Sequence, residues 1–312
     1  MQETEPSPQR FPLHEIIEAL SQQLGEKYVF PDKAQQITTT LRQHLDSGAY
    51  DEIRDGHLLE QTLNSHLLEV SQDKHLRLFY LPDGVPDLID ENEVKTPEAI
   101  ERIRQKREQN YGLKKVEILD GNIGYFRFDE FVHPHVAGES MHAAMTFLTH
   151  TNALIIDLRA NGGGEATMVQ FLCSYFFDAF EAEHIQLNGL YNRRKNLLQQ
   201  YWVFPYVPGT RYLDKPMFLL TSPYTFSAAE EFAYNLQQLK RALVVGETTG
   251  GGAHAGAYYP IIASFGSFIP TYRAINPISG TNWERVGVQP DLPVAQEEAF
   301  DIAYHRAQAL VQ

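Results

Sequence analysis

The chain has 312 residues and carries 40 acidic against 26 basic side chains, a formal net charge of −14. An acidic surface argues against a nucleic-acid partner, because sequence-independent phosphate binding needs a basic face. Hydrophobic residues make up 43% and charged residues 21%, which are ordinary values for a globular chain and exclude intrinsic disorder. The single cysteine, Cys173, excludes an internal disulfide framework and a thiolate metal cluster.

The N-terminal segment contains neither the basic stretch nor the apolar run of a secretory signal. No stretch approaches the roughly 18 uninterrupted apolar residues that a membrane-spanning helix needs. We therefore expect a soluble protein without a transmembrane segment, either cytoplasmic or exported with its signal removed. The sequence leaves the compartment and the oligomeric state open.

The first seventy or so residues carry apolar side chains at helical spacing, in three runs punctuated by Pro31 and Gly48. This pattern predicts a small N-terminal helical bundle over residues 1–72. Residues 73–312 are predicted to form one α/β core.

A short strand is expected over residues 75–80, at the start of the predicted core. Residues 81–113 are polar, highly charged and contain proline, so we interpret them as a crossover or linker. The linker is predicted to hold one exposed helix, from about Pro97 to Gln109.

Beyond residue 113 apolar strands alternate with helical patterns, and this alternation is typical of parallel crossover units in a sheet covered by helices. Strands are predicted over 116–119, 123–128, 153–158, 217–221 and 242–245, and helices over 138–150, 166–177 and 228–239. Residues 257–293 are strand-rich and bounded by Gly and Pro. There is no internal repeat.

Three segments at the ends of predicted strands carry residues suited to chemistry, and the first is 155–164, a buried strand that runs into Gly162, Gly163 and Gly164 before a helix. Glycines let backbone N–H groups approach a ligand closely, and a helix N-terminus adds a positive dipole, so this loop suits an anion or oxyanion. A tight strand-to-helix turn explains the spacing equally well. No Gly-Lys-Ser/Thr follows, so it is not a Walker phosphate loop.

The second segment, 219–232, is a strand, a turn and a helix that opens with Ser227. One interpretation is that Ser227 only caps the helix, with Glu230 three residues later completing a capping box. The other is that the turn presents the serine hydroxyl as a nucleophile beside the amides of the first helical turn. The spacing does not decide between them.

The third segment, 245–256, is a strand that enters a glycine-rich loop, which we expect to form a flap or a substrate-binding rim. His254 lies in this loop. It is one of 12 histidines in the chain, and on its own it is more typical of a loop residue than of a catalytic base.

Together these segments resemble the S41 serine peptidases: the C-terminal processing proteases, the tricorn core and the interphotoreceptor retinoid-binding protein repeat. Within this family, the chain resembles most the bacterial relatives of the retinoid-binding repeat. The resemblance implies a ClpP/crotonase-like α/β core with a mixed sheet, behind a small helical bundle. Four motifs carry it in the family's order: DLRANGGG at 157–164, TFSAAE at 225–230, VGETTGG at 245–251 and GVQPD at 287–291.

Two departures from the processing proteases matter. Only about forty residues separate His75 from Lys114, too few for the PDZ domain that those proteases insert there. Their catalytic lysine position falls on Gly252 in this chain. A serine-lysine dyad therefore cannot operate through that residue.

The tricorn branch implies a different base, a histidine before the core, and a glutamate shortly before the Gly-Val-x-Pro-Asp motif. His75 and Glu284 occupy the matching positions. The resemblance thus implies a triad of Ser227, His75 and Glu284, in which the imidazole takes the serine proton and the carboxylate orients the imidazole. It implies a peptidase that cleaves unfolded proteins or short peptides.

The same resemblance implies that the oxyanion is held by the amides of Ala228 and of Gly162 or Gly163. No metal and no organic cofactor is expected, since no Cys/His spacing suggests a metal site. The implied substrate-binding residues are Gly251, Gly252 and His254.

Two alternatives stay open. The first is a non-catalytic carrier of retinoid, fatty acid or a similar apolar ligand, which 18 Phe and 16 Tyr would suit, although retention of all three triad residues weighs against it. In the second, His254 replaces the missing lysine as base. We rank His254 below His75 because its Gly and Ala neighbours offer little to orient an imidazole.

Overall fold

The computed structural model describes residues 11–84, 97–180, 184–262 and 264–311. Residues 1–10, the first half of the segment in which no secretory signal is expected, and residues 85–96 of the predicted crossover lie outside the described residues. The described chain forms two compact units. The first takes in the described residues of Met1–Asp90, Asn192–Leu197 and His254–Arg273, and the second those of Glu91–Tyr191, Leu198–Ala253 and Ala274–Gln312.

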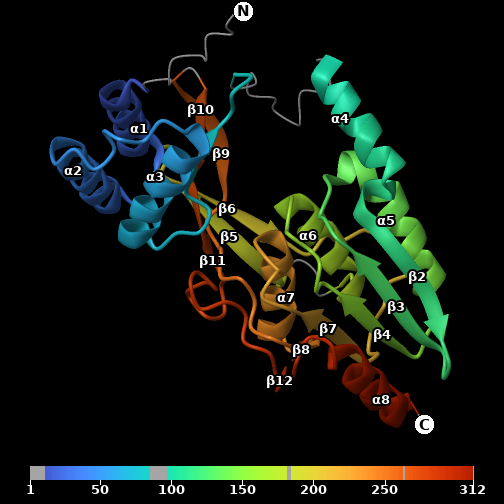
Figure 1. The fold of residues 1–312 in the computed structure, drawn as a ribbon. Coiled ribbons are helices and arrows are strands. Elements are labelled where there is room, and N and C mark those ends of the chain that lie inside the picture. The colour runs from blue at the N-terminus through green and yellow to red at the C-terminus, as the bar shows by residue number, and fades with distance from the viewer. Residues whose placement is uncertain (1–10, 85–96, 181–183, 263, 312) are drawn as a thin grey trace, which may run out of the picture. The chain divides into compact units, whose positions relative to one another are not determined.

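Three helices of the first unit follow the predicted periodicity (Figure 1): α1 (Leu13–Lys27), α2 (Pro31–Asp46) and α3 (Gly56–Ser71). Pro31 occupies the first turn of α2, where its missing N–H has no helical partner to lose. Asp55 caps α3 by accepting a hydrogen bond from the Leu58 amide at 2.8 Å. The breaks that Pro31 and Gly48 indicate therefore separate helices, as predicted.

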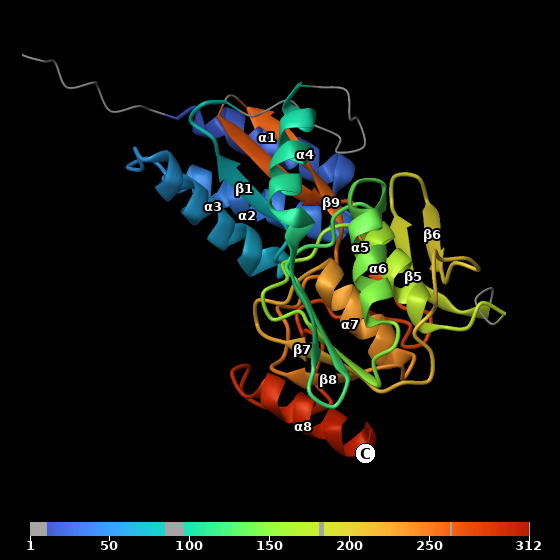
Figure 2. The ribbon, with the colours of Figure 1, turned by 90° about the vertical axis from the view of Figure 1, so that its right-hand side faces the viewer.

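A small antiparallel sheet completes the first unit (Figure 2). Its strands β1 (Arg77–Tyr80), β10 (Phe265–Pro270) and β9 (Gly256–Ile262) pair in that order. Leu78, Phe265 and Ile269 are buried in one core with the apolar faces of the three helices. Two strands from late in the chain thus cover the N-terminal helices.

The second unit is built on a six-stranded sheet, whose order is β12-β8-β7-β4-β3-β2. The strands are β2 (Leu113–Leu119), β3 (Ile123–Phe128), β4 (Ala153–Asp157), β7 (Met217–Thr221), β8 (Leu243–Gly246) and β12 (Leu292–Pro293). All neighbouring pairs are parallel except β2 with β3. The predicted fold class, helices followed by a mixed α/β sheet, is confirmed.

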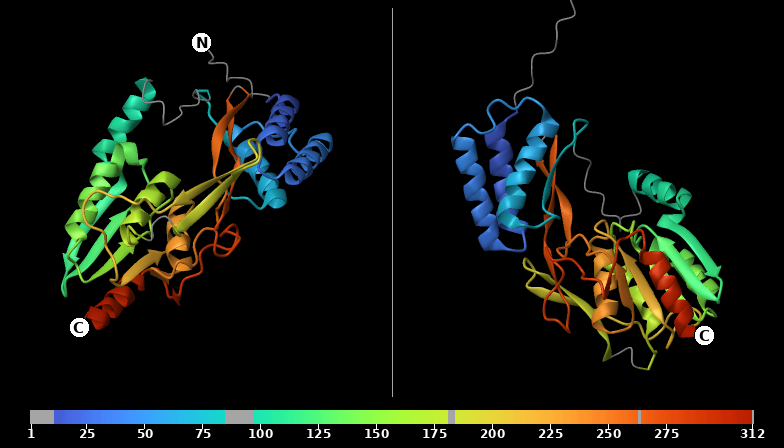
Figure 3. Two further views of the ribbon diagram at one scale, coloured as in Figure 1. Left: turned by 180° about the vertical axis from the view of Figure 1, so that it is seen from behind. Right: turned by 60° about the horizontal axis from the view of Figure 1, so that its bottom comes forward.

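Helices cover both faces of this sheet. The helix α8 (Ala299–Val311) packs against β3, β4, β7 and β8 (Figure 3), and its Ala303 lies in one buried cluster with Ile155 and Phe218. The helices α5 (Pro134–Leu148), α6 (Ala166–Cys173) and α7 (Ala228–Gln238) pack on the other face. Alternate strand residues thus serve two cores, which explains why these strands read as continuous apolar runs.

The remaining elements are a third sheet of order β11-β5-β6 and a few short helices. They comprise α4 (Pro97–Glu108), 3₁₀ turns at Asn110–Gly112 and Ser174–Phe176, β5 (Gln186–Asn192), β6 (Leu197–Trp202) and β11 (Tyr272–Ile275). Among the described residues, no helix combines the length and the hydropathy that crossing a bilayer requires.

Candidate active site

The motif loops gather at one edge of the second unit's sheet. Strands β8, β7 and β4 are parallel neighbours, so their carboxyl ends meet at the same edge. The three loops that follow β4, β7 and β8 are 158–165, 222–227 and 247–255, of which the second unit includes the last only as far as residue 253. Ligands of open α/β sheets bind at this edge, which makes it the candidate site.

Ser227 has a backbone conformation that ordinary helix caps do not have. It precedes α7 with φ +56° and ψ −119°. N-cap residues normally lie in the β region, and a non-glycine residue at positive φ costs about 1–3 kcal/mol that the surrounding structure must offset. Its N–H donates to Glu230 Oε2 at 2.8 Å and its side chain pairs with the Glu230 backbone, so the predicted capping box is present. The strained strand-to-helix turn is the geometry that presents a nucleophile.

Side-chain and backbone hydrogen bonds tie the serine turn to the glycine loop. Thr225 Oγ1 donates to the Leu158 carbonyl at 2.9 Å, and the Phe226 amide donates to the Asn161 carbonyl at 3.2 Å. Thr225 and Asn161 are fully buried. The sequence motif marks this loop, but nothing in its spacing predicts these two bonds.

Gly163 lies directly against Ser227. Its φ is +108°, and a Cβ added to it would lie 2.7 Å from Ser227 Cβ and 3.0 Å from the Ala228 nitrogen. Real side chains do not tolerate the shorter distance, so only glycine fits here. The structure thus brings together Ser227, Ala228 and one of the two glycines implied for the oxyanion site.

The amides of both candidate glycines donate within the protein. Gly162 N donates to the Asp129 carbonyl at 3.2 Å, at the long end of the normal range. Gly163 N donates to Asn161 Oδ1 at 2.9 Å, and Asn161 is itself held by its bond to the Phe128 carbonyl.

The loop after β8 is anchored by Glu230, whose side chain is completely buried. The amides of Gly251 and Gly252 donate to its two carboxylate oxygens at 2.6 and 2.9 Å. Burial raises the pKa of Glu230, and these bonds oppose that rise. Of the predicted rim residues, Gly251 and Gly252 are therefore held in place rather than forming a free flap.

Glu284 lies beside the same loop. Its Oε2 accepts a hydrogen bond from the Ala253 amide at 2.6 Å, and the indole of Trp283 donates to the Gly252 carbonyl at 2.7 Å. The side chain of Glu284 is thus positioned by the loop that Glu230 anchors.

Both candidate histidines belong to the first unit and meet at Asp73, which is 1% exposed. His254 Nδ1 lies 2.8 Å from Asp73 Oδ2, the Tyr28 hydroxyl donates to the same oxygen at 3.1 Å, and the His75 amide donates to Oδ1 at 3.0 Å. Burial opposes ionisation of Asp73, but the bond from His254 and the two imidazoles outweigh it and hold its pKa below the usual range.

The expectation that His254 has little to orient it is therefore wrong. A buried carboxylate holds its ring, as a general base requires. Asp73 and His254 are 181 residues apart, so no local pattern could reveal the pair.

Burial lowers the pKa of His75 to about 4, despite the opposing effect of Asp73. The charges of His254 and Arg77 act in the same direction as burial, and the value of about 4 includes their effect. The imidazole is therefore neutral at neutral pH, which is the form that accepts a proton.

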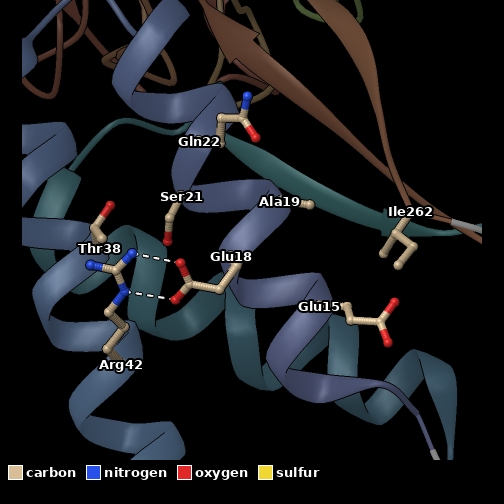
Figure 4. A pocket seen from close by; sticks show the side chains of 8 residues that line it. All are labelled: Glu15, Glu18, Ala19, Ser21, Gln22, Thr38, Arg42 and Ile262. Atoms are coloured by element: carbon tan, nitrogen blue, oxygen red, sulfur yellow. Dashed lines mark hydrogen bonds and ion pairs between the residues drawn. The ribbon is translucent and has the colours of Figure 1, made fainter.

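The first unit also has a surface pocket, and none of the candidate site residues lines it (Figure 4). In it Arg42 makes two hydrogen bonds to Glu18, at 2.6 and 2.7 Å. Exposed ion pairs of this kind contribute little to stability, because solvent screens the two charges. The lining residues are Glu15, Glu18, Ala19, Ser21, Gln22, Thr38, Arg42 and Ile262, and none of them was predicted for catalysis or binding.

Three of the solved structures that are similar to this chain illustrate the shared fold. A Bacteroides fragilis protein assigned to the S41 proteases has 19% identity and a TM-score of 0.53, over 64% of this chain and 56% of that one. A Parabacteroides merdae protein assigned as a peptidase has 19% identity and a TM-score of 0.61, over 97% of each chain. The photosystem II D1 C-terminal processing protease has 15% identity and a TM-score of 0.54, over 93% and 94%. The chain thus spans just over half of the Bacteroides fragilis structure.

Two sequence families match the chain. The model of "N-terminal domain of Peptidase_S41 in eukaryotic IRBP" matches residues 9–116. The model of "Peptidase family S41" matches residues 122–294, more than half of the chain and all four motifs that suggested the resemblance. The protein therefore belongs to peptidase family S41.

Proposed function

We propose that this protein is a serine peptidase whose nucleophile is Ser227. The observation that carries the proposal is the backbone of Ser227, at φ +56° and ψ −119° before α7 with Gly163 packed against it. A serine that only capped the helix would not need this strained turn or a neighbour without a side chain. Membership of a peptidase family supports the same conclusion.

In the proposed mechanism Ser227 attacks the carbonyl carbon of a peptide bond while His75 takes its proton. His75 then returns that proton to the leaving amine, and Glu284 orients the imidazole and stabilises its cation. The low pKa of His75 keeps the base in its neutral form. The bond from Ala253 to Glu284 favours one orientation of the carboxylate.

The proposed oxyanion donors are the amides of Ala228 and Gly162. Ala228 is the first residue of α7, so its amide lies at the positive end of the helix dipole. The Gly162 amide donates to a carbonyl at 3.2 Å, whereas the Gly163 amide donates to Asn161 at 2.9 Å. Because the longer bond is the weaker one, a developing oxyanion displaces it more easily, and we therefore choose Gly162 as the donor. Losing one such donor typically costs about 10²–10³ in rate.

We further propose that Gly251, Gly252 and His254 form a rim against which an extended peptide binds. The substrate class would be unfolded proteins or short peptides, cleaved near their carboxyl ends. The fold shared with a C-terminal processing protease favours this mode.

Covalent labelling tests the proposal. Wild-type protein should take up one fluorophosphonate per chain on Ser227, and Ser227→Ala should take up none while keeping the wild-type unfolding midpoint. A wild-type protein that takes up no label and cleaves no peptide would contradict the proposed peptidase activity. If native mass spectrometry then showed a stoichiometric retinoid or fatty acid, the protein would be an apolar-ligand carrier.

The pH profile of labelling tests the base. The free-enzyme rate should stay near its plateau down to about pH 5 and fall with a midpoint near 4, because His75 must be neutral and its pKa is about 4. Circular dichroism at each pH should show that the protein stays folded. A midpoint near 6.5, the ordinary histidine value, would show that the base is not His75 in this environment.

A further inference from the structure

We infer that Glu230 is a positioning residue that fixes the nucleophile turn and the loop beside Glu284 as one rigid assembly. The inference rests on the proposed function, since positioning matters for catalysis only if Ser227 reacts. Glu230 lies in the first turn of α7, three residues after Ser227, and its side chain is completely buried.

Its carboxylate receives four hydrogen bonds from two segments of the chain. Oε2 accepts from the amides of Ser227 at 2.8 Å and Gly252 at 2.9 Å. Oε1 accepts from the Thr249 hydroxyl at 2.5 Å and the Gly251 amide at 2.6 Å. Of these four bonds, only the one from the Ser227 amide belongs to a capping box. The other three bonds join the serine turn to the loop after β8.

The same loop positions the proposed triad carboxylate. Gly252 donates to Glu230, and the next residue, Ala253, donates to Glu284. The Thr249 hydroxyl also accepts from the Val288 amide at 2.7 Å. One buried side chain thereby sets the position of Ser227 directly and that of Glu284 through a single peptide unit.

Only a carboxylate satisfies this arrangement. An ionised glutamate accepts hydrogen bonds at both oxygens, whereas glutamine offers one oxygen and one NH₂ donor. In Glu230→Gln an NH₂ at the Oε2 position faces the amides of Ser227 and Gly252 and breaks both bonds. At the Oε1 position it faces the Gly251 amide and breaks that bond, while the Thr249 hydroxyl has to turn round to accept from it. Because misplacing a reacting group by about 1 Å costs about 10²-fold, we expect the maximal labelling rate of Ser227 to fall by about that factor.

Glu231→Gln is the matched control. Glu231 is the next residue of α7 and is also buried, but its carboxyl faces Asn188 and Asn235, and burial raises its pKa to about 7. Both variants remove one buried carboxylate from the same helical turn. Glu231→Gln should keep the wild-type labelling rate.

The experiment measures the maximal rate constant of fluorophosphonate labelling and the reagent's binding constant separately, on variants with confirmed circular dichroism. Glu230→Gln should lower the rate constant and leave the binding constant unchanged. Hydrogen exchange should show faster exchange at the amides of Ser227, Gly251 and Gly252 together. A folded Glu230→Gln variant that labels at the wild-type rate would overturn the inference, as would an equal loss in Glu231→Gln.

A second pair of variants decides the question if Glu230→Gln does not fold. Thr249→Val removes the hydroxyl that donates to Glu230 and should slow labelling about tenfold, which corresponds to a rise of roughly 1.4 kcal/mol in the activation free energy. Thr249→Ser keeps a hydroxyl and should restore the rate. Equal rates in the two would overturn the inference. A wild-type protein that takes no label would contradict the proposed function instead, and hydrogen exchange in Glu230→Gln would still test the joining of turn and loop.

Discussion

Replacing His75 with alanine should lower kcat/KM for peptide cleavage by about 10⁴-fold, the upper range for loss of a general base. In the proposed mechanism His75 accepts the proton of the Ser227 hydroxyl, so removing the imidazole leaves the nucleophile unactivated. His254→Ala should cost activity only about tenfold and act mainly on stability, because it removes a hydrogen-bond partner from buried Asp73, a loss of about 1–3 kcal/mol. Peptidase kinetics and thermal unfolding, measured on both variants, separate the two effects.

His57→Ala is the control for this pair, because the side chain of His57 is 65% exposed. It should match wild type in both measurements. A reversed outcome, with the larger loss of activity in His254→Ala, would identify His254 as the base with Asp73 as its orienting carboxylate. The proposed triad would then be wrong in its histidine while Ser227 kept its role.

Gly163→Ala should reduce the labelling rate of Ser227 by about 10³-fold, since it displaces the serine together with the neighbouring Ala228 amide, and losing one oxyanion donor typically costs about 10²–10³. The new methyl group would lie 2.7 Å from Ser227 Cβ, at a φ of +108° that alanine disfavours. Either the loop or the serine turn must move. The unfolding free energy should also fall, by about 1–3 kcal/mol for the backbone strain.

Gly162→Ala is a stability control for this substitution. A Cβ on Gly162 would meet nothing closer than the Tyr224 hydroxyl, at 3.8 Å. Its unfolding midpoint should therefore stay close to that of wild type. If Gly163→Ala labelled at the wild-type rate, the close packing of loop and serine would not matter for reactivity.

Local sequence pattern was sufficient for most of the second unit. The strands at Ile123–Phe128 and Met217–Thr221 match their predicted bounds to the residue, because each is an apolar run ended by polar or turn-forming residues. The helix predicted at 228–239 is α7, which begins where the Ser-x-x-Glu spacing indicates and ends one residue earlier.

Long-range pairing could not be predicted in the same way. Strands β9 and β10 were foreseen only as part of a strand-rich region, yet they pair with β1 and cover the N-terminal helices. Nothing within 256–270 specifies a partner near residue 77. The strands β5 and β6 and the helix α8 were not predicted; the small alanines with which α8 meets the sheet give a weak hydrophobic signal.

The site was predictable as a set of motifs and not as a set of contacts. The glycine loop and Ser227 were identified from spacing and family resemblance. The backbone strain of Ser227, the fit of Gly163 and the pairing of Asp73 with His254 depend on coordinates. Glu230 gave a local signal as a capping residue, but its bonds to Thr249, Gly251 and Gly252 join segments about twenty residues apart in the chain.

A crystal structure of the fluorophosphonate-treated protein tests the central claim most directly. We expect phosphorus bonded to Ser227 Oγ, with one phosphonyl oxygen about 2.7–3.1 Å from the Ala228 amide nitrogen and the His75 ring beside Oγ. An adduct on another residue, or a phosphonyl oxygen that points away from the Ala228 amide, would contradict the proposed catalytic centre.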